Sequence, residues 1–307
     1  MALALIFPGQ GSQYVGMAAP LAASEPAAAE VLRTADDVLG FSLSRLMTEG
    51  PEEALTATMN AQPALLTHSV AVLRVLGDRV GPPALAAGHS LGEFTAHVAA
   101  GTISFEDALE AVRLRGQLMH TAGQTRPGAM AAILGLDDHT VEDVCTRVES
   151  GLCVPANFNA EGQVVVSGDV PAVEEATELA KAAGAKRAIR LNVSGAFHSP
   201  LMDPAAEGLR EHLAGLDFRD PEFPVVSNAT ATPVTSGELA RELLVKQVTA
   251  PVRWRQTIDT MLAAGVSGFL EIGAGKVLCT LNRRNAKGVD CSAIGEPEDL
   301  LAIQALT

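Results

Sequence analysis

Short apolar segments alternate with helical patterns along most of the chain, and this alternation narrows the possible folds more than any other feature. Strands of this kind form a largely parallel sheet covered by helices, so the sequence predicts an α/β fold. The expected strands of this sheet are ALALIF (2–7), ALAA (84–87), FPVVSN (223–228) and GFLEIG (268–273), and the expected helices are 25–39, 62–77, 93–100, 105–121, 201–214 and 252–264.

The segment 128–194 has a different order, namely strand, helix, strand, strand, helix, strand. This is the order of a ferredoxin-like unit, and turn-rich sequences border it on both sides. We therefore predict a hydrolase-like parallel-sheet domain formed by 1–124 and 199–307. A small ferredoxin-like subdomain over 125–198 is inserted into it, and the cleft between the two is a natural place for a site.

Composition excludes several classes of function. The chain has 307 residues and 48% hydrophobic residues, enough for a substantial core. Its net charge of −14 argues against nucleic acid and anionic membrane surfaces as partners. No apolar run approaches the ~20 residues of a membrane helix. The N-terminal MALALIF has no preceding basic residue and is interpreted as a first strand rather than a signal peptide.

The four cysteines, at positions 145, 153, 279 and 291, show no CxxC spacing. Neither a zinc site nor a disulfide framework is therefore expected, and no metal site is predicted. A reducing cytoplasm is the expected location of the protein.

The stretch GHSLGE at 88–93 resembles a nucleophile elbow after the apolar segment ending in Leu85-Ala86-Ala87. Gly88 and Gly92 lack the Cβ that would clash where a strand turns sharply into a helix. Such a turn exposes the Ser90 hydroxyl and points the next backbone N–H toward the same place. An ordinary strand–turn is the alternative interpretation.

Arg115 lies near the middle of an apolar stripe on the predicted helix 105–121. Ala108, Val112 and Met119 form this stripe, whereas the charged residues of the helix lie opposite. A buried guanidinium without a partner is costly, so Arg115 needs an anion. That anion is either an Asp or Glu of the chain or the carboxylate of a substrate held by a bidentate contact.

Seven histidines are candidates for a catalytic base, and His198 is the preferred one. It lies in SGAFHSP, a loop between a strand and a helix, where catalytic side chains are commonly displayed. His89 adjoins Ser90, and neighbouring side chains diverge at such a turn. Two glycine-rich stretches, GQGSQYVG (9–16) and EIGAGKV (271–277), lack the spacing of nucleotide-binding loops, although the first could supply the N–H groups of an oxyanion hole.

Together these stretches resemble the malonyl-CoA:acyl-carrier-protein transacylase family, an acyltransferase family of fatty acid and polyketide synthesis. The resemblance runs from end to end and its order and spacing are specific. The matching motifs are PGQGSQ (8–13), QPALLT (62–67), GHSLGE (88–93), RGQLM (115–119), NFNAEGQVVVSG (157–168), GAFHS (195–199), PVRW (251–254) and EIGAGKVL (271–278). This chain departs from the family at Ala250, where Asn is usual, and at Ala274, where Pro is common.

The resemblance implies a role for each matched residue. Ser90 would be the nucleophile and His198 the general base and acid. Arg115 would bind the free malonyl carboxylate. The remaining implied residues are Gln10 and Leu91, whose backbone N–H groups would form the oxyanion hole, Gln247, whose backbone carbonyl would orient His198, and Phe197 and Met119, which would contact the substrate.

The implied activity is transfer of a malonyl group from malonyl-CoA to the phosphopantetheine thiol of a separate acyl carrier protein, by a ping-pong mechanism. No cofactor of the enzyme's own is implied, and a monomer is expected. A serine thioesterase or esterase with the same elbow is the alternative enzyme. A non-catalytic carrier-binding module is the alternative outside enzymes. The sequence leaves open whether the carrier serves fatty acid or polyketide synthesis.

Overall fold

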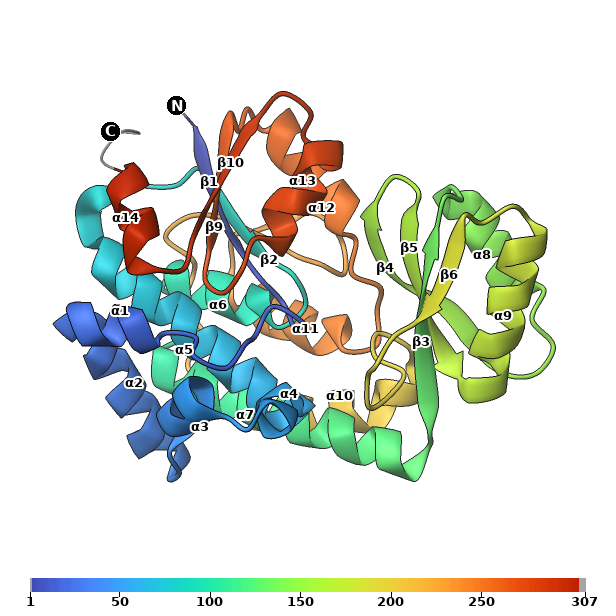
Figure 1. Cartoon of the computed structure of the whole chain (residues 1–307), viewed down its shortest axis with the longest axis horizontal. Helices are drawn as coiled ribbons and strands as arrows, with labels where there is room; N and C mark the ends of the chain where they lie inside the picture. The colour runs from blue at the N-terminus through green and yellow to red at the C-terminus, as the bar shows by residue number, and fades with distance from the viewer. Residues whose placement is uncertain (1, 304–307) are drawn as a thin grey trace.

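The computed structural model describes residues 2–303 and contains two separate sheets (Figure 1). The larger sheet has the strand order β10-β9-β1-β2-β7-β8, and its strands are parallel except for β8, which is antiparallel to β7. These strands are β1 (Leu3–Phe7), β2 (Leu85–Gly88), β7 (Val225–Val226), β8 (Pro233–Val234), β9 (Gly268–Ile272) and β10 (Asp290–Ile294).

The central strand β1 shows why its sequence is apolar throughout. It pairs with β2 on one side and β9 on the other, so both of its faces are covered by helices. Leu5 and Phe7 pack into the core that contains α5 (Thr58–Leu76) and α7 (Phe105–Thr125). Ala4 and Ile6 pack into the core that contains α12 (Trp254–Ala263) and α13 (Val277–Asn285). The two layers of helices are visible on either side of this sheet in Figure 1.

The helices that cover the large sheet lie before and after the inserted unit in sequence. Before it come α1 (Ala19–Ser24), α2 (Pro26–Leu39), α3 (Leu43–Glu49), α4 (Glu52–Thr56), α5 (Thr58–Leu76), η1 (Gly77–Arg79), α6 (Gly92–Ala99) and α7 (Phe105–Thr125). After it come η2 (Pro200–Met202), α10 (Asp203–Leu213), α11 (Gly237–Gln247), α12 (Trp254–Ala263), α13 (Val277–Asn285) and α14 (Pro297–Ile303). None of the helices within residues 2–303 is long and apolar enough to cross a membrane.

The second sheet is antiparallel and has the order β4-β5-β3-β6. Its elements are β3 (Gly128–Leu134), α8 (Asp138–Thr146), β4 (Cys153–Ala160), β5 (Gln163–Asp169), α9 (Val170–Ala182) and β6 (Arg187–Arg190). The predicted ferredoxin-like unit is therefore confirmed, together with the α/β class of the main sheet. The borders 125 and 198 stay a prediction, since this sheet itself extends only from Gly128 to Arg190.

The small sheet is joined to the large domain by backbone hydrogen bonds along β4. The Phe158 N–H donates to the Val252 carbonyl at 2.9 Å, and the Val252 N–H donates to the Ala156 carbonyl at 2.8 Å. Figure 1 shows the small sheet beside the large domain, with the segment between α11 and α12 passing close to β4. This contact fixes one wall of the cavity described below.

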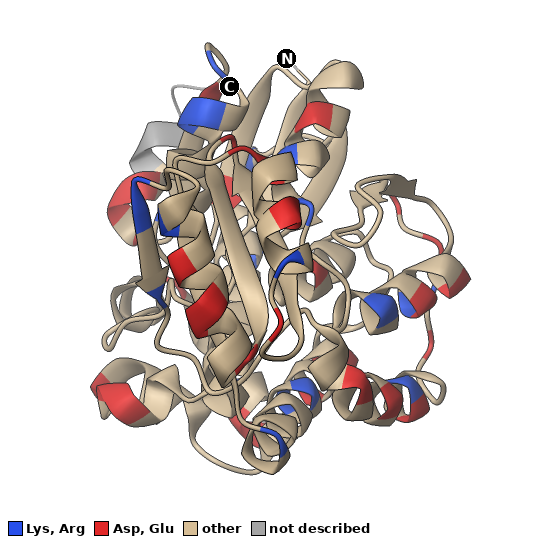
Figure 2. Ribbon diagram, turned by 90° about the vertical axis from the view of Figure 1, so that its right-hand side faces the viewer, with Lys and Arg blue, Asp and Glu red and all other residues tan. Residues whose placement is uncertain are grey.

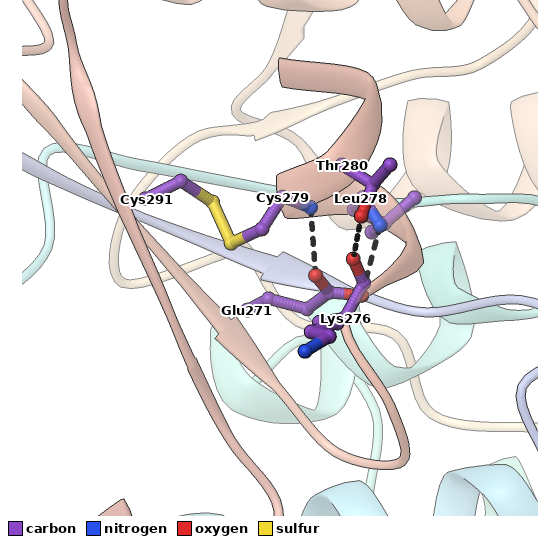
Figure 3. The surroundings of a disulfide bond; sticks show 6 residues. All are labelled: Glu271, Lys276, Leu278, Cys279, Thr280 and Cys291. Carbon is purple, nitrogen blue, oxygen red and sulfur yellow. Dashed lines mark hydrogen bonds between the residues drawn. A yellow bond between two sulfur atoms is a disulfide. The ribbon is translucent and has the colours of Figure 1, made fainter. Parts of the chain in front are cut away.

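The expectation that the cysteines form no disulfide is wrong for one pair. Cys279, on α13, is bonded to Cys291, on β10, with a Cα–Cα distance of 5.4 Å (Figure 3). Spacing along the chain does not reveal this pair, because the fold packs α13 against the edge strand β10 and so brings the two side chains together. Cys145 and Cys153 are buried free thiols whose Sγ atoms lie 3.9 Å apart.

Candidate active site

Ser90 occupies a sharp turn between β2 and α6 and has a φ of +53°, in the left-handed region. A Cβ on Gly88 would lie 1.9 Å from the Gly92 carbonyl carbon, and one on Gly92 would lie 2.3 Å from the Phe7 carbonyl oxygen. Both glycines are therefore required by the close approach of backbone to backbone. The ordinary strand–turn is excluded, since the turn has the strained serine of a nucleophile elbow.

His198 joins Ser90 to the end of helix α11. The Ser90 Oγ lies 2.8 Å from His198 Nε2, while His198 Nδ1 lies 2.9 Å from the Gln247 carbonyl oxygen and 3.2 Å from that of Ala250. A carbonyl oxygen only accepts, so Nδ1 carries the proton and Nε2 is free to accept one from Ser90. The substitution of Ala for the usual Asn at 250 leaves this arrangement intact, because only the backbone takes part.

Arg115 is buried, with 1% of its surface exposed, and its guanidinium points at Ser90. Nη2 donates to Ser90 Oγ and to Gln247 Oε1, both at 3.0 Å, and Nη1 donates to Gln62 Oε1 at 2.6 Å. Among the described residues Arg115 forms no ion pair, so an internal salt bridge does not account for its burial. Its protein acceptors are neutral, which leaves its charge available for a ligand.

A cavity of about 430 Å³ opens beside these residues, between the elbow and the small sheet. Its lining combines residues of the large domain with residues of the small sheet. Helix α13 contributes Val277, Leu278 and Leu281, and the small sheet contributes residues of β3, β4 and β5. The cavity-lining residues that the sequence singled out are Gln10, Ser90, Leu91, Arg115, Met119, Phe197 and His198. Gln247 lies behind the cavity and is fully buried.

Gln10 and Leu91, whose backbone N–H groups are the predicted oxyanion hole, both line this cavity. Leu91 directly follows Ser90 at the N-terminal end of α6, and Gln10 lies in the loop after β1. Within residues 2–303 neither N–H donates to another backbone oxygen outside regular helices and strands. The Gln10 side chain is held by a hydrogen bond from Nε2 to Thr58 Oγ1 at 3.2 Å.

Burial sets the protonation states of the site. It lowers the pKa of His198 to about 3, with the positive charge of Arg115 acting in the same direction. It also lowers the pKa of Arg115 to about 10, opposed by the charge of Glu93. At neutral pH the imidazole is therefore uncharged and able to accept a proton, while the guanidinium is charged.

Three residues that hold the site together were not assigned a role from the sequence. Gln62, on α5, accepts from Arg115, and Asn228, just after β7, accepts from the Ser90 N–H at 2.7 Å through Oδ1. Asn228 also donates from Nδ2 to the Gly88 carbonyl at 2.7 Å. Glu93, on α6, accepts from Gln247 Nε2 at 2.6 Å. For Gln62 the available signal was the same as for Arg115, since it is a polar residue in a helical stretch that is otherwise apolar.

Among residues 2–303 no group of three His, Cys, Asp or Glu side chains is arranged to hold a metal ion. His89, which lines the cavity, instead has its Nε2 2.9 Å from Asn159 Oδ1 on β4. This contact ties the elbow to the small sheet.

A parallel α/β sheet with a serine–histidine pair at a nucleophile elbow, beside a buried arginine, defines an acyltransferase of the α/β class. Residues 4–296 match the family model described as "Acyl transferase domain". The chain is 48% identical to the malonyl CoA-acyl carrier protein transacylase of Bacillus subtilis, over 99% of this chain and 97% of that protein. It is 46% identical to the protein of the same name from Escherichia coli K12, over 97% of both chains.

Solved structures similar to this chain carry the same kind of name as these relatives. A malonyl-transacylase in complex with a type II polyketide synthase acyl-carrier protein superposes with a TM-score of 0.96 at 43% identity, covering 100% of both chains. An acyl carrier protein S-malonyltransferase from Vibrio cholerae superposes with a TM-score of 0.95 at 42% identity, covering 99% of this chain and 100% of that one. The chain belongs to the malonyl-CoA:acyl-carrier-protein transacylase family.

Proposed function

We propose that this protein transfers the malonyl group of malonyl-CoA to the phosphopantetheine thiol of an acyl carrier protein, through a malonyl ester on Ser90. The observation that carries the proposal is the position of Ser90 Oγ. It lies 2.8 Å from His198 Nε2 and 3.0 Å from Arg115 Nη2, so a nucleophile, a base and a carboxylate-binding cation meet at one atom.

In the loading half-reaction His198 Nε2 takes the proton of Ser90 as Oγ attacks the thioester carbonyl. The Gln247 carbonyl keeps Nδ1 protonated and the ring correctly oriented. The backbone N–H groups of Gln10 and Leu91 stabilise the oxyanion, and loss of one such donor typically costs about 10²–10³ in rate. CoA leaves as a thiol that receives its proton from His198, and the ester remains on Ser90.

Arg115 selects the acyl group. A carboxylate that enters the cavity would take the place of neutral acceptors around the guanidinium and form charge-assisted hydrogen bonds of roughly 1.5–3 kcal/mol. This corresponds to a preference for malonyl over acetyl of about 10- to 150-fold. Phe197 and Met119 line the same cavity and bound the space around the acyl chain, so the aromatic ring of Phe197 would crowd an α-methyl group.

In the second half-reaction the thiol of the carrier attacks the ester by the reverse of the same steps. Two exposed basic segments are close in sequence to residues that line the cavity and are suited to an anionic carrier: Lys186, Arg187 and Arg190 at β6, and Lys276, Arg283 and Arg284 at α13. Exposed apolar side chains accompany them, since Ile189 is 45% and Val277 48% exposed. On the side seen in Figure 2, however, Lys and Arg are interspersed with Asp and Glu, so the two segments are small basic areas on an acidic protein.

The remaining expectations are part of this proposal. The enzyme uses no cofactor of its own, acts as a monomer and lies in the cytoplasm. The division into 1–124 with 199–307 and an inserted 125–198 is supported by the position of the second sheet. Disulfides are rare in a reducing compartment, so in the cytoplasm the Cys279–Cys291 pair is expected to be two thiols.

The main alternative is a serine thioesterase or esterase. It requires an acidic residue to orient the histidine and an apolar acyl pocket, whereas His198 faces two backbone carbonyls and the cavity contains Arg115. A non-catalytic module is disfavoured by the short contact between Ser90 and His198. The names of the relatives also support the transferase.

Intact-protein mass spectrometry tests the proposal directly. Mixing the protein with malonyl-CoA should give a malonyl adduct that persists and is discharged by the thiol of a holo acyl carrier protein. The ester persists because the reaction has a thiol acceptor and not water as its second substrate. Accumulation of free malonate without an adduct would instead establish the hydrolase.

Replacing Arg115 with alanine should lower the loading ratio of malonyl-CoA to acetyl-CoA by about 10- to 150-fold, because the charge-assisted contact is lost. Single-turnover loading with each thioester measures this ratio. Arg113→Ala is the matched control, since Arg113 lies on the same helix but donates to the Met59 carbonyl and covers the Phe41 ring. An unchanged ratio in the Arg115 variant would show that the carboxylate binds elsewhere.

A further inference from the structure

Glu93 is a fully buried carboxylate directly behind Arg115, and none of the catalytic steps above uses it. It lies in the first turn of α6, three residues after Ser90. Its Oε2 accepts two hydrogen bonds, from Gln247 Nε2 at 2.6 Å and from the Asn228 N–H at 3.0 Å. Its Oε1 has no hydrogen-bond partner within the described part of the chain, although the nearby Ser227 side chain favours the ionised carboxylate and so lowers its pKa.

Gln247 connects Glu93 to the arginine through its amide. Its Nε2 donates to two acceptors, Glu93 Oε2 and the Ser90 carbonyl, so its Oε1 must face the guanidinium of Arg115. Glu93 and Arg115 are therefore separated by one amide group, in a region that water does not reach. In this environment the charge of each strongly affects the other.

When Glu93 is ionised in the free enzyme, its negative charge balances the positive charge of Arg115. The other titratable side chains buried in the elements around Glu93 are His68 on α5, His97 on α6 and His198. Burial lowers their pKa values to about 4, 3 and 3, so all three are neutral. None of the charged residues of α11 is buried: Glu242 and Lys246 are exposed and Arg241 is half-buried.

A bound malonyl group adds a second carboxylate to the same guanidinium. Two carboxylates and one guanidinium would leave a net negative charge buried in the protein, which is unfavourable. Uptake of one proton by a carboxylate would remove this net negative charge. Glu93 can accept this proton on Oε1, which has no partner to lose, while Oε2 keeps both of its hydrogen bonds and Gln247 stays in place.

We propose that Glu93 balances the charge of the loaded site by taking up one proton from solvent on Oε1 when the substrate's carboxylate binds Arg115. This inference rests on the proposed function, because it requires a substrate carboxylate at Arg115. Glu93 acts through Gln247 and Arg115 and is a positioning and charge-balancing residue. It does not touch the reacting atoms.

The direction of the pH dependence follows from the ionisation of Glu93 in the free enzyme. Burial raises the pKa of Glu93 to about 7, against the effect of the hydrogen bond from Gln247. Below that pH, Glu93 is already protonated and loading takes up no proton. Above it, the acetyl-enzyme holds an ionised Glu93 and the malonyl-enzyme a protonated one. The preference for malonyl should therefore fall as pH rises, by at most about tenfold per pH unit.

The experiment measures the exchange constant between the two acyl-enzymes. The protein is equilibrated with a fixed mixture of malonyl-CoA and acetyl-CoA from about pH 6 to about pH 9, and the two adduct masses are quantified. Ionisation of CoA affects both adducts equally and cancels in their ratio. We expect the malonyl-to-acetyl ratio to be flat at the acid end and to fall about tenfold or more toward the alkaline end.

The Glu93→Gln variant removes the charge but keeps the size of the side chain. Its amide oxygen can still accept hydrogen bonds from Gln247 and Asn228. Its ratio should be independent of pH and should exceed that of the wild type at the alkaline end. Glu271→Gln is the matched control. Glu271 is also fully buried, and its pKa is also raised to about 7 by burial, but it accepts from the N–H groups of Leu278 and Cys279 (Figure 3). This control should keep the wild-type pH dependence.

The possible failures can be told apart. A malonyl adduct whose ratio to acetyl does not change with pH in the wild type would overturn the role of Glu93 alone. The same slope in Glu93→Gln and wild type would overturn it as well. If no malonyl adduct forms, the proposed function fails and this inference fails with it. If the Glu93→Gln variant does not fold, the pH dependence of the malonyl-to-acetyl ratio in the wild type still tests the proposal.

Discussion

Replacing Ser90 with alanine is expected to abolish the malonyl adduct and to lower transfer to the carrier by about 10⁶-fold, as for other enzymes with a serine nucleophile. The reason is that Oγ is the atom shared by His198 and Arg115, and the chain offers no other hydroxyl in contact with His198 Nε2 among the described residues. Alanine should tolerate the backbone turn as well as serine does. Intact mass after mixing with malonyl-CoA measures the adduct, and the thermal midpoint reports the fold.

Ser167→Ala is the matched control for this result. Ser167 is a fully buried serine on β5 that lies outside the cavity lining, and its hydroxyl has no hydrogen-bond partner within residues 2–303. Its adduct should form as in the wild type. A malonyl ester that still forms on the Ser90 variant would place the nucleophile elsewhere and remove the basis of the ping-pong mechanism.

The sequence predicted the parts of the fold that depend on local pattern. The buried strands β1, β2 and β9 lie within one or two residues of their predicted ranges, because continuous apolar runs are typical of strands covered on both faces. The edge strand β10 was missed. Its sequence DCSAI pairs on one side only and is mostly half-buried, so it lacks such a run. Helix α5 begins at Thr58 rather than 62, since its first turn is less apolar than the rest.

The site was predictable where one residue broke a local pattern. Arg115 was identified as a charge inside an apolar helical stripe, and Ser90 from the two glycines around it. His198 was preferred from its loop, while the orienting carbonyl of Gln247 came from family resemblance alone. The Cys279–Cys291 bond and the contacts of Asn228 depend on segments far apart in sequence, and no local pattern encodes those distances.

Glu93 was overlooked because its burial depends on contacts between distant segments and not on local sequence. It belongs to GHSLGE, where a glutamate at the start of a helix is expected to be solvent-exposed and to stabilise the helix N-terminus. The structure instead buries it, because α6 packs between the large sheet and α5, α7 and α11. Only the packing shows that its carboxylate faces Gln247 and, through it, Arg115.

Replacing His198 with alanine should lower the loading rate by about 10⁴- to 10⁶-fold, since Ser90 then has no base within hydrogen-bond reach. The wild-type pH profile gives an independent check. The active form of the base is the neutral imidazole, and the pKa of His198 is lowered to about 3, so this form persists well below neutral pH. Loading by acetyl-CoA, which brings no carboxylate to Arg115, should therefore stay constant from about pH 8 down to about pH 5.

Stopped-flow or quenched loading with acetyl-CoA measures this profile without the contribution expected from Glu93. His139→Ala is the control variant, because His139 is exposed on α8 in the small unit and should leave the rate unchanged. A loading rate that falls with a midpoint near the ordinary histidine pKa of about 6.5 would contradict the expected state of His198. It would mean that water reaches the imidazole and that burial does not control the base.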